Sequence, residues 1–407
     1  MLNNTFNDFY ASEMCLSFFL VYIYIMGLNG NEVSDTQYHY LVAILDSSHL
    51  LTFLISLVLI IYGSFRGISL ENERNLEKER NKENEVCKES SILGSHTIES
   101  SEAICFPLAA SASLLFMFFL FDSLQMVFAL LMAVLATMAC SFLLLPACIF
   151  ALGLCFNPHR RLILPLVGCF TSAELLSLVS SFYIVLLWVF TGNWLLMDTL
   201  SMALCTTMIA LVQVPSLKVS VLLMLGLLAY DVFWVFLSER IFSVNVMVNV
   251  ATRQASNPVT LITNQLNMEN VVHPPNLLSL PATIMFPSSK HDGQFSILGL
   301  GDIVIPGLLL CFLLKFDYHK SIFINGSTAK FKPMYFMSSL IGYLLGLVSA
   351  TVASDVYHVA QPALLYLVPF TVLPLVVQAY IKGDLKSMWN HPTSLKHPAS
   401  ISSKHII

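Results

Sequence analysis

Two aspartates lie inside long apolar stretches of this chain. Asp231 stands in the run 219–238, within LLAYDVFWVFLSER, and Asp302 stands in the run 296–314, which reads SILGLGDIVIPGLLLCFLL. An ionised acid in hydrocarbon costs about 2.5–3.5 kcal/mol on insertion scales. That cost indicates that both side chains are used within the membrane.

The two aspartates are expected at a similar depth. Their apolar runs are consecutive, so the predicted helices are antiparallel and can be compared from the same side. Asp231 lies 8 residues before Glu239, and Asp302 lies 10 residues after Asp292. With a rise of 1.5 Å per residue, these separations are roughly 12 and 15 Å. The carboxylates are therefore predicted to lie within about one helical turn of the same level.

Such a pair has a defined chemistry. Two close carboxylates cannot both ionise cheaply, so one stays protonated while the other acts as a base. The base takes a proton from water while the acid donates one to a carbonyl oxygen, which hydrolyses a peptide without metal or covalent intermediate. Either aspartate alone could instead hydrogen-bond a neighbouring helix, but their matched depth favours catalysis. Four other acids near helix ends are expected to be solvated there: Asp46, Asp122, Glu174 and Asp198.

Glycine and proline flank these positions. Gly299 and Gly301 precede Asp302 and remove side chains where another backbone could approach, although close helix packing would also explain them. The segment QPALLYLVP begins with Gln361 at the start of the last apolar run. Pro362 cannot donate a backbone hydrogen bond, so it fits the first turn of a helix or an irregular entry, and Ala363 keeps that entry narrow.

The elements that carry these residues are predicted to be membrane helices. The chain has 407 residues, of which 56% are hydrophobic and only 11% charged, whereas soluble proteins have about 25% charged residues. A spanning helix needs about 20 apolar residues. Nine runs satisfy this, which predicts an all-α polytopic membrane protein: 41–65, 104–122, 125–151, 165–191, 194–214, 219–238, 296–314, 334–354 and 360–381.

Basic residues indicate the orientation of these helices. Alternate connections hold 17 of the 20 lysines and arginines, and only Arg240, Arg253 and Lys290 lie on the other side. Because basic residues stay in the cytosol, the pattern predicts nine crossings with a lumenal N-terminus and a cytosolic C-terminus. The resulting organisation is a lumenal segment 1–40 with a short apolar run of open role at 14–28, a first helix 41–65, a charged cytosolic loop 66–103, helices two to five in 104–214, a catalytic region 215–381 with lumenal loop 239–295, and a cytosolic tail 382–407.

Other kinds of site are not indicated. The nine cysteines form no C-x-x-C pair or Cys/His cluster with zinc spacing. Neither a disulfide framework nor a metal site is expected, and the dyad chemistry needs no cofactor. Nothing points to nucleic acid.

Three short motifs occur in order on the last apolar runs: Tyr230-Asp231, Gly299-Leu300-Gly301-Asp302 and Gln361-Pro362-Ala363-Leu364. Together they resemble the GxGD intramembrane aspartyl proteases. The similarity extends over about residues 37–390 and is greatest to signal peptide peptidase-like proteins of the plant branch. It implies a nine-helix bundle of the presenilin and signal peptide peptidase type.

The resemblance also implies residue roles and substrates. Asp231 and Asp302 would be the catalytic pair. The PAL segment (Pro362, Ala363 and Leu364) would shape the site and position substrate, with Tyr230, Gly299 and Gly301 in support. Substrates would be type II single-pass helices and signal-peptide remnants, cut within the bilayer. A homo-oligomer is compatible with this scheme.

Presenilins share the motifs, but their catalytic helices run in the opposite direction. The distribution of basic residues here selects the signal peptide peptidase orientation. Two departures are expected to matter. About 40 residues before the first span are too few for the protease-associated domain of longer members, which predicts a short form. The end KHII lacks the second lysine of a dilysine signal, so an endosomal membrane is as well supported as the endoplasmic reticulum.

A proton-coupled secondary transporter is the competing interpretation, because transporters also place acids at the bilayer midplane. Such a carrier predicts internal symmetry between its halves. Both acids and the Pro-interrupted run instead fall in the C-terminal half, which favours the protease.

Overall fold

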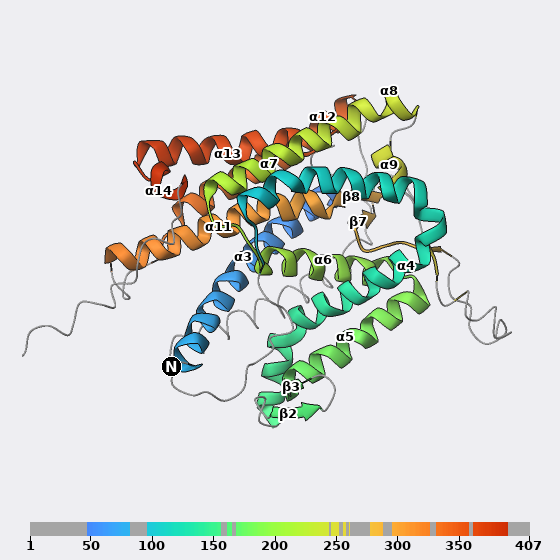
Figure 1. The fold of residues 1–407 in the computed structure, drawn as a ribbon, viewed down its shortest axis with the longest axis horizontal. Coiled ribbons are helices and arrows are strands. Elements are labelled where there is room, and N and C mark those ends of the chain that lie inside the picture. Colours follow the sequence, from blue (N-terminus) through green and yellow to red (C-terminus); the bar gives the residue numbers. More distant parts are fainter. Residues whose placement is uncertain are drawn as a thin grey trace, which may run out of the picture.

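The computed structural model describes residues 47–81, 96–155, 161–164, 168–243, 246–251, 255–257, 260, 277–287, 295–325, 331–357 and 361–389. Within them the protein is a bundle of long helices (Figure 1), so the all-α polytopic fold is confirmed. Eight segments of the described residues are long and apolar enough to span a membrane: His49–Arg74, Ser100–Phe121, Leu124–Gly153, Ser172–Thr191, Trp194–Leu211, Leu217–Phe242, Met334–Ser354 and Leu364–Ile381.

The helices follow the apolar runs along the chain. Their bounds are α3 Ser47–Asn81, α4 Ser100–Cys155, α5 Ser172–Thr191, α6 Trp194–Leu211, α7 Leu217–Val232, α8 Ser238–Phe242, α9 Val246–Ala251, α11 Leu300–Asn325, α12 Met334–Tyr357, α13 Leu364–Ile381 and α14 Leu385–Trp389. A π-helix, η1 at Phe233–Leu237, joins α7 to α8.

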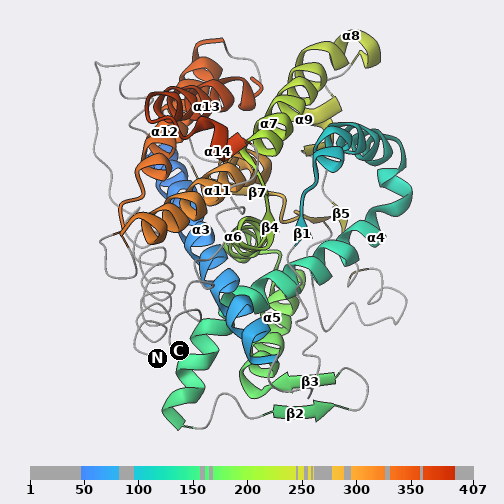
Figure 2. The same ribbon diagram turned by 60° about the vertical axis from the view of Figure 1, so that its left-hand side comes forward.

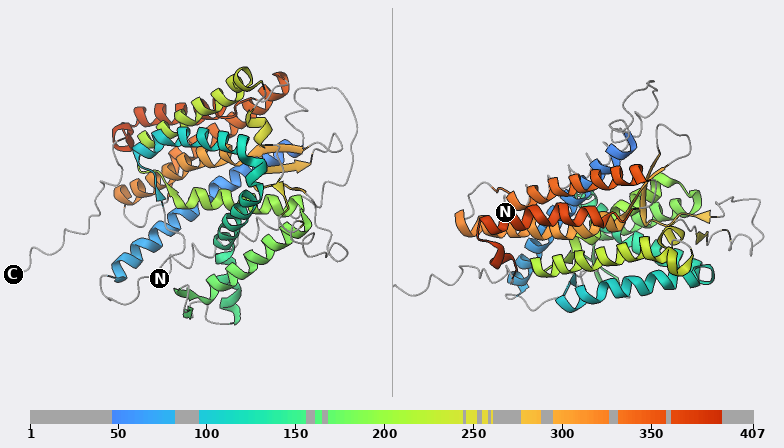
Figure 3. Two further views of the ribbon diagram at one scale, coloured as in Figure 1. Left: turned by 45° about the vertical axis from the view of Figure 1, so that its right-hand side comes forward. Right: turned by 90° about the horizontal axis from the view of Figure 1, so that it is seen from above.

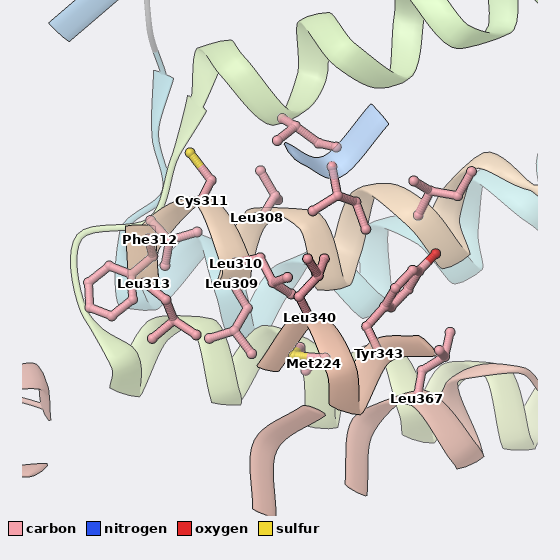
Figure 4. Close-up of a cluster of buried hydrophobic side chains, with 14 of the residues drawn as sticks. Met224, Leu308, Leu309, Leu310, Cys311, Phe312, Leu313, Leu340, Tyr343 and Leu367 are labelled. Carbon is pink, nitrogen blue, oxygen red and sulfur yellow. The ribbon is translucent and has the colours of Figure 1, made fainter. Parts of the chain in front are cut away.

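Helices α6 and α11 form the interior of the bundle. Helix α11 packs against α3, α6, α7, α12 and α13, and Figure 2 shows α6 end-on with α3, α4 and α5 around it. The side chains of Leu308–Leu314 on α11 are all buried. Met224 of α7, Tyr343 of α12 and Leu367 of α13 pack around them (Figure 4). The helix that carries Asp302 therefore lies at the centre of the core.

The strands pair in twos. β1 (His96–Thr97) is parallel to β4 (Val212–Gln213), whereas β2 (Arg161–Leu164) with β3 (Gly168–Thr171), β5 (Ala255–Ser256) with β6 (Leu277–Leu278), and β7 (Thr283–Pro287) with β8 (Phe295–Gly299) are antiparallel. The β7–β8 hairpin lies where α11 begins (Figure 3). We call this the hairpin end of the bundle.

The opposite end, which we call the basic end, gathers lysines around two acids. Glu71 of α3 accepts from Lys315 of α11 at 3.0 Å. Asp384, just after α13, pairs with Lys320 of α11 and accepts from the Tyr335 hydroxyl group at 2.5 Å. These contacts tie the ends of α3, α11, α12 and α13 together.

Polar caps set several helix starts. Thr171 and Glu174 form a capping box at the start of α5, in which the Glu174 carboxylate accepts the Thr171 N–H at 2.9 Å. Glu174 thus lies at a helix end and is partly exposed, as expected, and it also caps the helix. The predicted span 165–191 was wrong at its start, because residues 168–171 form β3, whose last residue, Thr171, is the cap of α5.

Other predicted boundaries need correction as well. Helix α3 continues through the first part of the predicted loop 66–103 to Asn81, and α4 is one continuous helix across the two runs 104–122 and 125–151. In the predicted span 296–314, residues 296–299 belong to β8, and α11 then runs on to Asn325. The depth estimate for Asp302, which assumed a helix there, therefore does not hold as calculated. The run 14–28 lies outside the described residues.

Candidate active site

Asp231 lies one residue before the end of α7 and is almost wholly buried, with 4% of its surface exposed. Its Oδ2 accepts the backbone N–H of Leu364 at 3.4 Å. Leu364 is the first residue of α13, whose first N–H groups lack partners inside the helix. The free N-terminal end of α13 is therefore directed at Asp231, 133 residues earlier in the sequence.

The PAL segment forms the entry to α13. Gln361 and Pro362 precede the helix, Ala363 caps it, and Pro362 and Leu364 are buried. The Pro362 carbonyl accepts from Leu365 N–H at 3.1 Å, which closes the first turn. Pro362 thus stands where a missing N–H costs nothing. Ala363 is partly buried against the main core.

Asp302 is in the first turn of α11, directly after β8. Gly299 ends β8 opposite Thr283 of β7. A Cβ atom at Gly299 would lie 3.3 Å from Oδ2 of Asp302, whereas a Cβ at Gly301 would meet nothing within 4 Å. The first glycine therefore makes room for the aspartate, and the second leaves open space beside the turn.

The two aspartates lie on helices that contact each other. Helix α7, which carries Asp231, packs against α11, which carries Asp302. Leu227, Ile303 and Leu364 are buried near them in one apolar cluster. The PAL segment contacts Asp231, and Gly299 leaves room for Asp302 on the neighbouring helix.

Comparison with known proteins agrees with this arrangement. The family model for signal peptide peptidase matches residues 90–395, which contain all three motifs. The chain belongs to the signal peptide peptidase family. It is 36% identical to signal peptide peptidase-like 1 of Arabidopsis thaliana over 75% of this chain and 84% of that protein. It is also 36% identical to signal peptide peptidase-like 1 of Oryza sativa subsp. japonica, over 72% and 82%.

A more distant relative is signal peptide peptidase-like 2B of Rattus norvegicus, with 35% identity over 48% of this chain and 31% of that protein. No solved structure matches the chain. At the level of the family, this signal peptide peptidase homologue is a multi-pass intramembrane protease of the endomembrane system that acts on membrane helices.

In this signal peptide peptidase homologue the π-helix begins at Phe233, two residues after Asp231. Single π-helical turns within α-helices occur often at functional sites. Within it, Trp234 is buried and its Nε1–H donates to Ser111 Oγ of α4 at 3.1 Å. Tyr230 packs between two apolar clusters. One is formed by Leu114, Trp234 and Val246, and the other is the large core around α11. The widened turn is thus fixed to α4 on the hairpin side of Asp231, a feature that hydrophobic periodicity alone does not show.

Sequence reasoning missed one polar contact beside the site. Asp198 of α6 was expected to be solvated at a helix end, yet it is fully buried and its Oδ1 accepts the Met285 N–H of β7 at 3.0 Å. The expectation was wrong because the neighbouring loop folds back over α6. No pattern in the sequence pairs Asp198 with a backbone N–H 87 residues away.

Proposed function

We propose that this protein is an aspartic endopeptidase that hydrolyses peptide bonds of type II single-pass helices and signal-peptide remnants inside the membrane. Asp231 and Asp302 are its catalytic pair. The supporting observation is the hydrogen bond from Leu364 N–H to Asp231. It joins the PAL segment, at the start of α13, to the carboxylate on α7, and α7 packs against α11. The helices that carry or follow the three motifs, α7, α11 and α13, pack against one another.

The proposed reaction uses one water molecule and one shared proton. One carboxylate removes a proton from the water, whose oxygen attacks the scissile carbonyl carbon, while the other carboxyl group donates its proton to the carbonyl oxygen. As the gem-diol collapses and the C–N bond breaks, the carboxyl group that took the proton from water gives it to the departing nitrogen, and the other carboxylate takes a proton from a gem-diol hydroxyl group. Both carboxyl groups return to a state with one proton between them.

The substrate helix must be unwound locally before this reaction. Its scissile carbonyl groups are otherwise bonded within the helix, and Asp231 is buried. We assign the entry of α13 to this task, since Gln361 and Pro362 have no helical conformation there. Pro362 keeps this edge irregular because it supplies no N–H for another turn.

In the cell, we propose a lumenal N-terminus, a lumenal loop 239–295 and a cytosolic C-terminus, in an endosomal or endoplasmic reticulum membrane. The lysines of the basic end support this polarity. The family match favours a protease over a proton-coupled transporter. Tyr230, Gly299 and Gly301 are proposed to shape the site, and no metal or cofactor is required.

The test is cleavage of a reporter type II helix by purified protein in lipid. Asp231→Ala and Asp302→Ala should each abolish cleavage while expression stays near normal. Asp302→Asn keeps the shape of the side chain and removes the acid, so it too should be inactive. Wild-type turnover in Asp302→Asn would contradict the proposed dyad.

A further inference from the structure

The β7–β8 hairpin determines where the second aspartate lies. Its register pairs Thr283 with Gly299 and Met285 with Ile297, and Ala282 O accepts the Leu300 N–H at 3.3 Å. Only Leu300 and Gly301 separate the end of β8 from Asp302. The position of the hairpin therefore constrains where the first turn of α11, and Asp302 in it, can lie.

Apolar contacts hold the hairpin against the bundle. Ile284 and Phe286 of β7 are buried in the main core, and β7 packs against α3 and α6. Figure 1 shows β7 and β8 above α6. Hydrophobic contact is non-directional, so it keeps the strand inside but specifies its position along its own axis only weakly.

Asp198 supplies the directional contact. It lies in the second turn of α6, is 0% exposed, and accepts the Met285 N–H at 3.0 Å. A buried backbone N–H requires a partner, and this one is directed to α6 rather than to β8. The bond attaches a single residue of β7 to a helix in the interior of the bundle.

The other oxygen of Asp198 shows what the side chain contributes. Oδ2 is buried and has no hydrogen-bond partner among the residues that the structure describes. The observed contact therefore needs an acceptor at Oδ1 and does not use the second oxygen. An asparagine has the same shape and the same acceptor.

We propose that Asp198 is a positioning residue for the catalytic pair. By accepting the Met285 N–H, it fixes the β7–β8 hairpin on α6 and so holds Gly299 and Asp302 at the level of Asp231. The role in catalysis rests on the proposed function, whereas the anchoring of the hairpin does not. A displacement of about 1 Å at a reacting group can reduce turnover about 100-fold, which makes a single anchoring bond consequential.

The experiment compares four single variants of the full chain in lipid. Asp198→Leu removes the acceptor, Asp198→Asn retains it, and Met285→Pro removes the donor while leaving the N–H pattern of β8 intact. Thr206→Val is the control, because Thr206 is buried on the same helix and, among the described residues, its hydroxyl group bonds to Met202 O of that helix alone.

Two readouts separate positioning from folding. Amide hydrogen exchange over residues 283–299 reports on the anchor whether or not the protein is active. Turnover of the reporter helix, divided by the number of sites titrated with a transition-state analogue, reports on catalysis per folded active site. We expect Asp198→Leu and Met285→Pro to increase exchange in the hairpin and to lower kcat about tenfold or more, with a smaller change in KM.

Asp198→Asn and Thr206→Val should resemble the wild type in both readouts. The double variant Asp198→Leu/Met285→Pro should be no worse than either single variant, because both remove the same bond. Loss of activity in Asp198→Asn would overturn the proposal, since an acceptor would not suffice. Unchanged exchange or unchanged kcat in Asp198→Leu would also overturn it. An inactive wild type would instead count against the proposed protease function, so the two failures are distinguishable.

Discussion

At the scale of single residues, the space around Asp302 is set by a missing side chain. A Cβ atom at Gly299 would stand 3.3 Å from the Asp302 carboxylate oxygen. We expect Gly299→Ala to displace that carboxylate by a few tenths of an ångström and to reduce turnover several-fold, about 1 kcal/mol of transition-state stabilisation. Reporter cleavage per titrated active site measures the effect.

Gly153→Ala is the matched control. Gly153 lies in α4, and an added Cβ would meet nothing within 4 Å. It should cleave the reporter at the wild-type rate. Equal rates for Gly299→Ala and Gly153→Ala would show that the open space beside Asp302 is not needed for catalysis.

The sequence was sufficient to find the motif residues but not their surroundings. Asp231 and Asp302 are conspicuous because acids are costly in apolar runs, and the helices that carry them pack against each other. Asp198 is an acid in an apolar run too, but its partner is a backbone N–H of Met285, and every residue except proline has one. A contact of that kind has no signature in the residue types.

At the scale of elements, hydrophobic runs predicted the helices well and their boundaries less well. The start of the predicted span 296–314 is a strand because Ser296–Gly299 pairs with β7, and short apolar runs fit a strand or a helix equally. The π-helix after Asp231 was not predictable from periodicity, since it extends an already apolar helix by one widened turn.

The N-terminus of α12 provides a test at this scale. Asp317 of α11 is nearly buried and accepts the N–H groups of Tyr335 and Phe336 at 2.9 and 3.2 Å. Burial raises the pKa of Asp317 from 3.8 to about 6, although these hydrogen bonds and the charges of Lys382 and Lys320 oppose the rise. The folded protein therefore binds the proton more tightly than the unfolded chain does.

The sign of the pH dependence follows from that difference. The contribution of Asp317 to stability is fully present below about pH 4 and is lost as the pH rises through about 6. Burial alone would raise the pKa of nearby Asp384, but hydrogen bonds from Lys320 and Tyr335 lower it below its usual value. Asp384 therefore changes its protonation at a lower pH than the range from 4 to 7 considered for Asp317. We expect the free energy of unfolding to fall by about 2 kcal/mol from pH 4 to pH 7 through Asp317.

Asp317→Asn should remove this part of the pH dependence. Thermal unfolding in detergent at pH 5 and pH 7 measures it: the wild type should gain stability at pH 5 relative to the variant. An identical change in Tm for both proteins would mean that Asp317 does not retain the proton on folding.

At the scale of the whole molecule, charge is divided between the two ends of the bundle. The basic end holds Lys315, Lys320 and Lys382 in ion pairs or over the ring of Tyr335. At the hairpin end, Arg240 is the only basic residue that the structure describes. The basic residues of alternate connections in the sequence are thus gathered at one end of the folded bundle.

This asymmetry predicts how the protease sits in the membrane. Moving the lysine-rich end across a bilayer is unfavourable, so that end should stay in the cytosol. The loop 239–295, which joins α7 to α11 at the hairpin end, should then be lumenal. Single cysteines introduced at Ser289 and Ser403 of a variant without accessible native cysteines should react with an impermeant reagent from opposite sides of sealed vesicles. Labelling of both cysteines from the same side would contradict the proposed polarity. Type II helices would then not meet Asp231 and Asp302 in the orientation that the proposed function requires.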